Sequence, residues 1–356
     1  MNDRMNALFT KMPQCEAAYI KTEVNRFYFL GFDSGDAGTV LLLRDKAYFI
    51  IDSRYIEIAT ENVKSAEVVL ENKALVQVKE LLEKHGVKKL HLESGLTLGE
   101  AAKLREALGG GIQLDTGDEL TGVITSLRAI KSEVEVDAIR RAQKITDDCF
   151  SYMLTYIKPG MREIDIALEM EMFMRRAGAK KLAFNTILIA GKKTSLPHGE
   201  PGDNIVQNGD FITMDFGANV DGYCSDMTRT IALGSITEEQ RLVYETVLKA
   251  QLAACEGAKA GMRGCEVDKI SRDIINSAGF EGKFGHGLGH SLGIEIHEDP
   301  RFSPTCDTII QKGMMMTIEP GIYLAGKFGV RIEDTVLMCE NGIEILAKSD
   351  KNLIVI

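Results

Sequence analysis

Four acidic residues in the second half of the chain have a spacing that could hold metal ions. Asp215 and Asp226 flank residues 219–222, an Asn-Val-Asp-Gly stretch that favours a hairpin turn. The midpoint of 215 and 226 is 220.5, inside that turn, so we expect the two aspartates to face each other. Glu319 and Glu333 have their midpoint at 326, in a Leu-Ala-Gly-Lys stretch, and predict a second facing pair. Opposed side chains on one face of a hairpin have Cβ atoms about 5 Å apart.

Such acidic pairs need a compensating charge. Like charges opposed across a hairpin destabilise it, and packed carboxylates raise one another's pKa values until they take up protons. Exposed acids on polar strands would avoid the conflict, but Asp215 lies in the apolar run 211–216, which is typical of a buried strand. Two divalent cations supply +4 against −4, and two-metal sites hold their ions about 3.5–4 Å apart. The four carboxylates therefore predict a two-metal centre.

The histidines gather in the same region, since four of the six are His198, His286, His290 and His297. His286 and His290 have the i, i+4 spacing of a helical metal pair. Glycines at positions 285, 287 and 289 disfavour a helix, because each interior glycine costs about 1 kcal/mol. We expect a glycine-rich strand or loop there, with close backbone approach.

Composition excludes several classes of protein. The net charge of −10 over 356 residues argues against a nucleic-acid partner, and no apolar run is long enough to span a membrane. The first 13 residues carry charges without a following apolar core, so we expect no secretory signal. Seven scattered cysteines without a CxxC pair favour a reducing compartment, and we expect a cytoplasmic protein.

Two regions with different patterns must position the site. The first alternates strand-like and helix-like runs, which predicts an α/β domain over residues 1–124. Its expected strands are residues 16–22, 26–32, 39–44, 47–52 and 88–93, and its expected helices are residues 73–85 and 98–108. The second region, residues 125–356, includes a long helix predicted from Ser132 to Tyr156, where Ser132 and Glu135 have the spacing of a capping box.

An internal repeat runs through the second region. Residues 159–162 recur at 260–263, an offset of 101, and both are followed by helical patterns. Residues 209–217 match 313–321 at an offset of 104, which places Asp215 on Glu319. The segment that begins at Asp226 matches the one at Glu333, at an offset of 107. The common order predicts a duplication in which each half supplies two carboxylates to one centre.

Six segments together resemble the pita-bread metallopeptidases, in particular the proline-specific branch of Xaa-Pro dipeptidase (prolidase) and aminopeptidase P. The resemblance covers essentially the whole chain and implies a creatinase-type α/β N-terminal domain followed by an α+β pita-bread catalytic domain with a pseudo-twofold duplication. The segments are residues 214–217, 225–230, 284–290, 292–298, 317–323 and 329–335.

The resemblance implies a role for each candidate residue. Asp215 would hold the first metal, Asp226 and Glu333 would bridge both, and His290 and Glu319 would hold the second. Glu319 would also move a proton. The other implied roles are contact with the substrate for His198 and His297 and orientation of the carboxylates for Arg331. Carboxylate ligands with one imidazole favour Mn²⁺, and Co²⁺, Fe²⁺ and Zn²⁺ remain open. The family also implies a homodimer.

The expected activity is metal-dependent hydrolysis of the Xaa–Pro bond in proline-containing peptides. The alternative is a catalytically inactive binding protein on the same fold, which the complete set of five candidate ligands disfavours. Arg301 could bind the C-terminal carboxylate of a dipeptide, or could form a surface ion pair instead. Larger prolidases carry an insertion between the two glutamates, whereas 13 residues separate Glu319 from Glu333 here. Dipeptidase and aminopeptidase P therefore both stay open.

Overall fold

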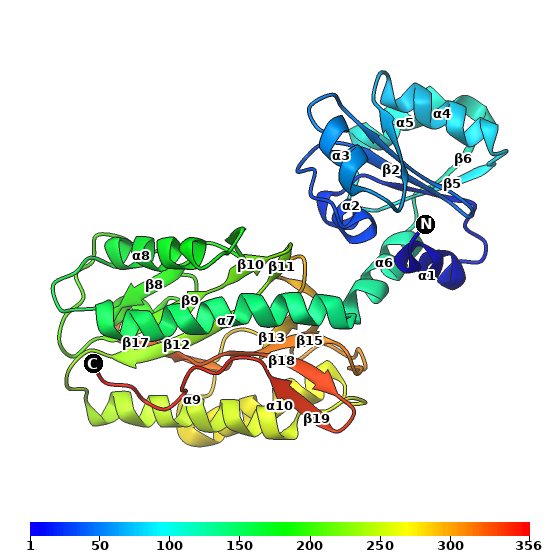
Figure 1. The fold of residues 1–356 in the computed structure, drawn as a ribbon. Coiled ribbons are helices and arrows are strands. Elements are labelled where there is room, and N and C mark those ends of the chain that lie inside the picture. Colours follow the sequence, from blue (N-terminus) through cyan, green and yellow to red (C-terminus); the bar gives the residue numbers. More distant parts are fainter. The chain divides into compact units, whose positions relative to one another are not determined.

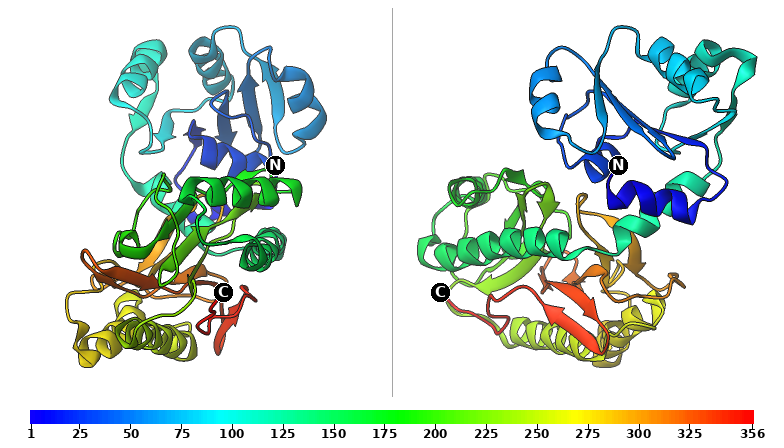
Figure 2. Two further views of the ribbon diagram at one scale, coloured as in Figure 1. Left: turned by 90° about the vertical axis from the view of Figure 1, so that its left-hand side faces the viewer. Right: turned by 45° about the vertical axis from the view of Figure 1, so that its right-hand side comes forward.

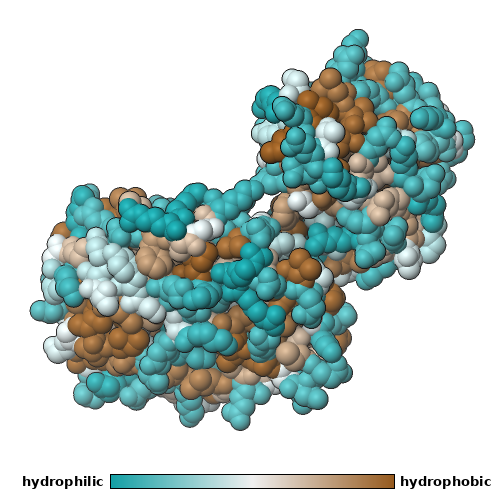
Figure 3. Space-filling model, in the orientation of Figure 1, coloured by the Kyte–Doolittle hydropathy of each residue, from teal (hydrophilic) through white to brown (hydrophobic).

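The computed structural model describes residues 1–356, which form two compact units, Met1–Arg128 and Ala129–Ile356 (Figure 1). The domain boundary expected between residues 124 and 125 lies inside helix α6 (Glu119–Ala129) and stays a prediction. In the space-filling view, hydrophilic side chains cover much of the visible face of each unit, with smaller apolar patches between them (Figure 3).

The first unit is built on a six-stranded sheet with the order β4-β3-β2-β1-β5-β6. Helices α4 and α5 cover one face, where Val78 and Leu104 join Leu41 and Leu90 in a common core. The strands are β1 (Ala17–Ile20), β2 (Thr39–Leu43), β3 (Ala47–Ile51), β4 (Glu67–Leu70), β5 (Lys89–Leu92) and β6 (Gln113–Asp115). The helices before α6 are α1 (Asp3–Lys11), α2 (Glu23–Leu30), α3 (Ile56–Asn62), α4 (Ala74–Lys84) and α5 (Leu98–Leu108), followed by the 3₁₀ turn Gly109–Gly111.

The α/β class predicted for this unit is confirmed, with one element wrong. Residues 26–32 were expected as a strand, but residues 26–30 belong to helix α2. Gly31 ends this helix in the left-handed conformation, with φ of 67°, and its N–H bonds to the carbonyl of Phe27. The aromatic run resembled a strand because Arg26, Tyr28 and Phe29 are all buried, which hides the helical period. Gly31 was the signal for a helix in the sequence, because a glycine commonly follows the last residue of a helix.

The second unit places strands between two pairs of helices, as Figures 1 and 2 show. The helices are α7 (Glu133–Tyr156), α8 (Glu163–Arg176), α9 (Glu238–Gly257) and α10 (Gly264–Ile275). One sheet has the order β12-β9-β8 and a second has the order β14-β13-β15-β18-β19. Their strands are β8 (Ile187–Ala190), β9 (Phe211–Phe216), β12 (Met227–Ala232), β13 (Gly289–Ser291), β14 (Glu298–Phe302), β15 (Met315–Ile318), β18 (Asp334–Cys339) and β19 (Gly342–Ile345).

Shorter elements complete this unit. They are β7 (Lys181–Leu182), β10 (Ala218–Val220), β11 (Tyr223–Cys224), β16 (Gly321–Leu324), β17 (Phe328–Arg331), the 3₁₀ helix η2 (Gly191–Ser195) and the turn η3 (Asn276–Phe280). The predicted capping box forms at the start of α7, where the backbone N–H and the hydroxyl of Ser132 donate to Glu135 at 2.8 and 2.7 Å. This box fixes where the long helix begins.

The predicted duplication is confirmed by the backbone. Gly160 and Gly261 have φ of 92° and 93°, and their N–H groups bond to the carbonyls of Val206 and Ile310. These partners are again 104 residues apart. Helices α7 and α8 with strands β8, β9 and β12 form the first half. Helices α9 and α10 with strands β13, β15 and β18 form the second half.

Candidate metal centre

The first acidic pair comes from strand β9 and the approach to β12. Asp215 lies opposite Thr228, not opposite Asp226, so the predicted direct pairing is wrong. The reason is the turn: β10 and β11 bring Val220 opposite Tyr223, which centres the hairpin on 221.5 instead of 220.5. Asp226 precedes Thr228 by two residues and is therefore a diagonal neighbour of Asp215, still within reach of a shared ligand.

The second acidic pair has the predicted register. Ile318 lies opposite Asp334 between β15 and β18, and Gly321 lies opposite Arg331 between β16 and β17. In both pairings the midpoint of the two residue numbers is 326. Glu319 and Glu333 have the same midpoint and therefore face each other. The facing pair expected in this half is confirmed.

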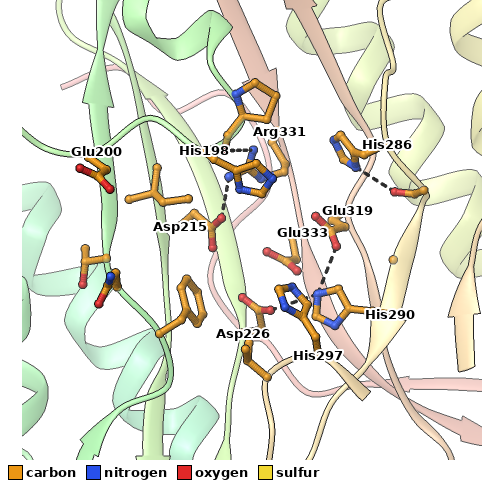
Figure 4. A pocket seen from close by; sticks show the side chains of 18 of the residues that line it. His198, Glu200, Asp215, Asp226, His286, His290, His297, Glu319, Arg331 and Glu333 are labelled. Carbon is orange, nitrogen blue, oxygen red and sulfur yellow. Dashed lines mark hydrogen bonds and ion pairs between the residues drawn. The ribbon is translucent and has the colours of Figure 1, made fainter. Parts of the chain in front are cut away.

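His290 lies in β13, and the expectation of a glycine-rich strand instead of a helix is confirmed. A Cβ atom at Gly289 would lie 2.0 Å from the carbonyl oxygen of Thr317, so only glycine permits this approach. The Nε2 atom of His290 lies 3.4 Å from Glu319 Oε1 and 3.6 Å from Asp226 Oδ2. One ligand atom each from Asp226, His290 and Glu333 fall within 4.8 Å of one another. Figure 4 shows this cluster, with Asp215 beside it.

The acidic groups of the cluster are hard to ionise as they stand. Burial raises the pKa of Asp226 well above its ordinary value, and Glu333 adds to the shift. Burial and the charge of Glu319 do the same to the pKa of Glu333. Burial raises the pKa of Glu319 to about 8, against the lowering effect of Arg331. These shifts describe a site that lacks positive charge.

The imidazole of His290 is held with its lone pair toward the acids. Its Nδ1 lies 3.1 Å from the carbonyl oxygen of Ser291, which can only accept, so Nδ1 carries the proton. Nε2 is then an acceptor that faces the carboxylate oxygens of Asp226 and Glu319. Burial, with a contribution from His297, lowers the pKa of His290 to about 3. The imidazole is therefore neutral and does not supply the positive charge that the site lacks.

These observations fit a divalent cation. The Oδ1 atoms of Asp215 and Asp226 are buried and have no hydrogen-bond partner. Together with Nε2 of His290, they offer lone pairs that a bound cation would satisfy. Four carboxylates and one imidazole, fixed through its Nδ1–H, form a donor set suited to divalent metal ions.

Three further side chains orient the acids. Arg331 donates from Nη2 to Asp215 Oδ2 at 2.6 Å, and from Nε to the hydroxyl of Thr228 at 3.1 Å. That hydroxyl donates to Glu333 Oε2 at 2.6 Å, and the hydroxyl of Thr317 donates to Glu319 Oε1 at 3.2 Å. Neither threonine was predicted from the sequence. Thr317 could have been found, because it precedes Glu319 by two residues on the same strand face.

A second chain of hydrogen bonds, also missed, leads from Arg331 to a neutral histidine. Nη1 of Arg331 donates to the hydroxyl of Tyr323 at 2.9 Å, and this hydroxyl lies 2.9 Å from Nε2 of His286. Nδ1 of His286 faces the carbonyl oxygen of Gly287 at 2.8 Å and so carries a proton. The Tyr323 hydroxyl therefore donates to Nε2. Burial lowers the pKa of His286 to about 4, in agreement with the neutral ring.

The remaining predicted residues line a cavity of about 780 Å³ that contains the cluster. His198 and His297 both line it, and the ring centroid of His297 lies 4.4 Å from that of His290 (Figure 4). Arg301 lies opposite His290 in the pairing of β13 with β14, is exposed, and makes no ion pair. The structure thus brings all the predicted site residues to one cavity, and the surface ion pair considered for Arg301 does not form.

A buried cluster of carboxylates and an imidazole in a cavity defines the class as a protein that binds divalent metal ions. Family comparison agrees: the model described as "Metallopeptidase family M24" matches residues 137–340, and the "Creatinase/Prolidase N-terminal domain" model matches residues 7–130. The chain belongs to metallopeptidase family M24, with a creatinase/prolidase N-terminal domain and a pita-bread catalytic domain. Divalent metal ions are the cofactors of that class.

Individual relatives cover nearly the whole chain. The Xaa-Pro dipeptidase of Pyrococcus furiosus is 36% identical over 356 residues, which is 99% of this chain and 100% of the relative. The solved structure of an Xaa-Pro dipeptidase from Bacillus anthracis is 36% identical, with a TM-score of 0.95 and 99% coverage of both chains. An X-Pro aminopeptidase from Thermotoga maritima MSB8 is 33% identical, with a TM-score of 0.91 over 98% of this chain and 100% of that one. None of the helices has the length and apolar character that a membrane crossing requires.

Proposed function

We propose that this protein hydrolyses the peptide bond before proline in short peptides, with two divalent metal ions held by Asp215, Asp226, His290, Glu319 and Glu333. The observation that carries the proposal is the meeting of two acidic pairs with the Nε2 lone pair of His290 in the wall of one cavity. When bound, the ions supply the positive charge that lowers the pKa of water and polarises the scissile carbonyl. Mn²⁺ is the ion that this ligand set favours, because four of the five ligands are carboxylates.

The protein side chains supply proton transfer and orientation. Glu319 takes a proton from the attacking water and returns it to the proline nitrogen as the bond breaks, because an amine leaves only when protonated. His198 and His297 donate hydrogen bonds to the carbonyl oxygen as negative charge develops on it. Arg331 holds Asp215 in place through their 2.6 Å ion pair.

Arg301 favours dipeptides among the possible substrates. Its exposed guanidinium lines the cavity without an acidic partner, so it can pair with the C-terminal carboxylate of an Xaa-Pro dipeptide. In a tripeptide the carboxylate lies one residue further on, and the same contact would not form. Relatives of both types cover this chain, which is why the length of the substrate needs a direct assay.

The test compares Ala-Pro, Ala-Pro-Ala and Ala-Leu after the purified protein has been stripped of metal and reloaded with Mn²⁺. We expect cleavage of Ala-Pro that requires the metal, little cleavage of Ala-Pro-Ala, and none of Ala-Leu. Efficient cleavage of the tripeptide would exclude the dipeptidase assignment and support an aminopeptidase of the P type. Failure to cleave either proline peptide with Mn²⁺, Co²⁺, Fe²⁺ or Zn²⁺ would leave the inactive binding protein as the better explanation.

We also propose that the protein works as a cytoplasmic homodimer, with its domains divided at residues 124 and 125. The family resemblance supports the dimer, and the unpaired, dispersed cysteines support a reducing compartment. Light scattering coupled to size-exclusion chromatography would give about twice the mass of the chain, 39.2 kDa, if the dimer forms.

A further inference from the structure

The loop of residues 191–204 brings His198 to the cavity. It follows β8, begins with η2, and lines the cavity through Pro197, His198 and Glu200. His198 is exposed and makes no hydrogen bond within the chain. The direction of its imidazole therefore depends on whatever holds the loop.

One buried carboxylate contacts both ends of that loop. Glu163 is the first residue of α8 and has 0% exposure. Its Oε1 accepts hydrogen bonds at 2.8 Å from the backbone N–H of Ala190 and at 2.8 Å from the side-chain amide of Asn204. Its Oε2 accepts from Lys193 Nζ at 2.5 Å and from the N–H of Gly202 at 3.2 Å. Four donors thus converge on one side chain, and all four belong to the loop or to the residue before it.

Lys193 extends these contacts toward the cavity, and we call Glu163 and Lys193 together the brace. Besides its ion pair with Glu163, its Nζ donates to the carbonyl oxygen of Glu200 at 2.8 Å. Glu200 is two residues from His198, on the part of the loop that lines the cavity. The carboxylate thus reaches the substrate-facing segment through a single intervening side chain.

The second half of the duplication shows what the same loop does without such a carboxylate. The N–H of Glu163 bonds to the carbonyl of Asn204 at 3.0 Å, and in the second half the N–H of Gly264 bonds to that of Thr308 at 3.0 Å. Gly264 is therefore the counterpart of Glu163. A Cβ atom there would lie 2.4 Å from the backbone oxygen of Arg301, so the second loop packs directly on the helix end. In the first half, the Glu163 side chain fills the corresponding space.

We propose that Glu163 is a positioning residue that, with Lys193, fixes the loop of residues 191–204 so that His198 faces the substrate. The inference rests on the proposed function, because His198 acts on the substrate of that reaction. Glu163 itself touches no reacting atom. Its effect on catalysis passes through the loop, and removing it releases His198 without removing any metal ligand.

The variant Glu163→Gln tests this dependence. The amide keeps the shape of the carboxylate, but its NH₂ group must face donors that the lost oxygen accepted, and Lys193 loses its counter-ion. We expect kcat/KM for Ala-Pro to fall about 10- to 100-fold, mainly through kcat, because His198 acts on the charge that develops in the transition state, and we expect the bound metal to be unchanged. In the His198→Ala background the same substitution should cost less than about 2-fold, because its target is already gone. A fully additive loss would overturn the proposal, because it would mean that Glu163 acts independently of His198.

Glu169→Gln is the matched control, since it removes the same charge from α8 at a site that contacts Tyr152 and Arg176. We expect its kinetics to stay within about 2-fold of the original protein. If Glu163→Gln does not fold, Lys193→Met gives the same test, because it removes the other member of the ion pair, which is partly exposed. Lys193→Arg keeps the charge and should retain most of the activity that Lys193→Met loses.

Amide hydrogen exchange supplies a measurement that needs no catalysis. In the metal-loaded protein, Glu163→Gln should speed exchange in residues 191–204 about 10-fold or more and leave exchange unchanged in residues 292–306, the segment of the second half that contains β14. Unchanged exchange in the first loop would overturn the inference even if the enzyme proves active. Faster exchange in a protein that cleaves no Xaa-Pro peptide would instead support the brace and refute the proposed function.

Discussion

The two halves of the catalytic unit share a backbone and differ in what they place on it. Each half has a glycine with φ near 92° before its second helix, the same backbone hydrogen bonds to a returning loop, and an acidic residue in or directly after a central strand. Asp215 lies in β9, and Glu319 directly follows β15. The shared part of the two halves is therefore the scaffold and the carboxylates.

The differences lie in the neutral and basic side chains. His290 comes from the second half, and its counterpart in the first half provides no imidazole ligand. The loop of the first half carries His198 and is braced by Glu163, whereas that of the second half carries His297 and Arg301 and packs on Gly264. Duplication thus supplies a symmetric acidic site, and substitutions within each half make one side of the cavity different from the other.

The largest effect should come from removing an acidic ligand in either half. Asp226→Asn and Glu333→Gln keep the size of the side chain and remove a charge from the shared centre. We expect each to lower kcat/KM for Ala-Pro by about 10³-fold or more, because in the proposed centre both halves supply ligands to the ions. Asp221→Asn is the control, since Asp221 is an exposed turn residue with φ of 50°, which asparagine also adopts. A variant of one half that kept full activity would contradict a shared centre.

Metal removal should change how stability depends on pH. Folding raises the pKa of Glu319 from 4.5 to about 8, so between these values the folded metal-free protein binds more protons than the unfolded chain. Its free energy of unfolding should therefore fall as the pH rises from about 5 to 8, by roughly 2–4 kcal/mol relative to Glu319→Gln. Urea unfolding of both proteins in EDTA measures the difference. A stability of the metal-free protein that rises with pH relative to Glu319→Gln would contradict the prediction.

Arg331 links the halves and should give a smaller loss. It extends from β17 in the second half to Asp215 in the first, with a second bond to Tyr323. A lysine keeps the charge but cannot make these separate contacts, so Arg331→Lys should lower metal affinity and activity about 10- to 100-fold. Calorimetric titration with Mn²⁺ measures the affinity directly. An affinity equal to that of the original protein would mean that Asp215 is held by the strand alone.

The smallest effect should come from a substitution of Gly264, the counterpart of Glu163 in the second half. Gly264→Ala places a Cβ atom 2.4 Å from the Arg301 backbone oxygen and 2.8 Å from Cys306 Sγ, which pushes the second loop outward. We expect KM for Ala-Pro to rise about 3- to 10-fold with little change in kcat, because the proposed role of Arg301 is to bind the substrate carboxylate and not the reacting bond. Gly99→Ala in α5 is the control, since nothing lies within 4 Å of its added Cβ. An unchanged KM would show that Arg301 does not depend on this packing.

Much of the fold and the clustering of the site could be predicted from the sequence, for reasons that lie in particular residues. The register of Glu319 and Glu333 followed from symmetry about Gly326, because the turn there lies at the centre of the hairpin. For Asp215 the predicted hairpin centre was one residue too early, because the pairing of β10 with β11 places the turn at Asp221 and Gly222. Turn type is a local choice that the pattern of acids does not specify.

What could not be predicted is which distant side chains meet. Glu163 stands alone in the sequence as an acid in the first turn of a helix, where a carboxylate ordinarily needs no partner. Only the fold brings Ala190, Lys193 and Asn204 to it. The same is true of the contact of Tyr323 with His286. Such bonds depend on tertiary packing between segments about 30–40 residues apart, and no local period encodes them.

The most direct test of a metal centre shared between the halves is the number of Mn²⁺ ions bound per chain. The metal-stripped protein and Asp226→Asn would be titrated with Mn²⁺ and the bound metal counted by mass spectrometry after rapid desalting. We expect two ions per chain in the original protein and at most one, weakly held, in Asp226→Asn, because we propose that Asp226 bridges both ions. Two ions retained in the variant, or none bound by the original protein, would contradict the shared centre.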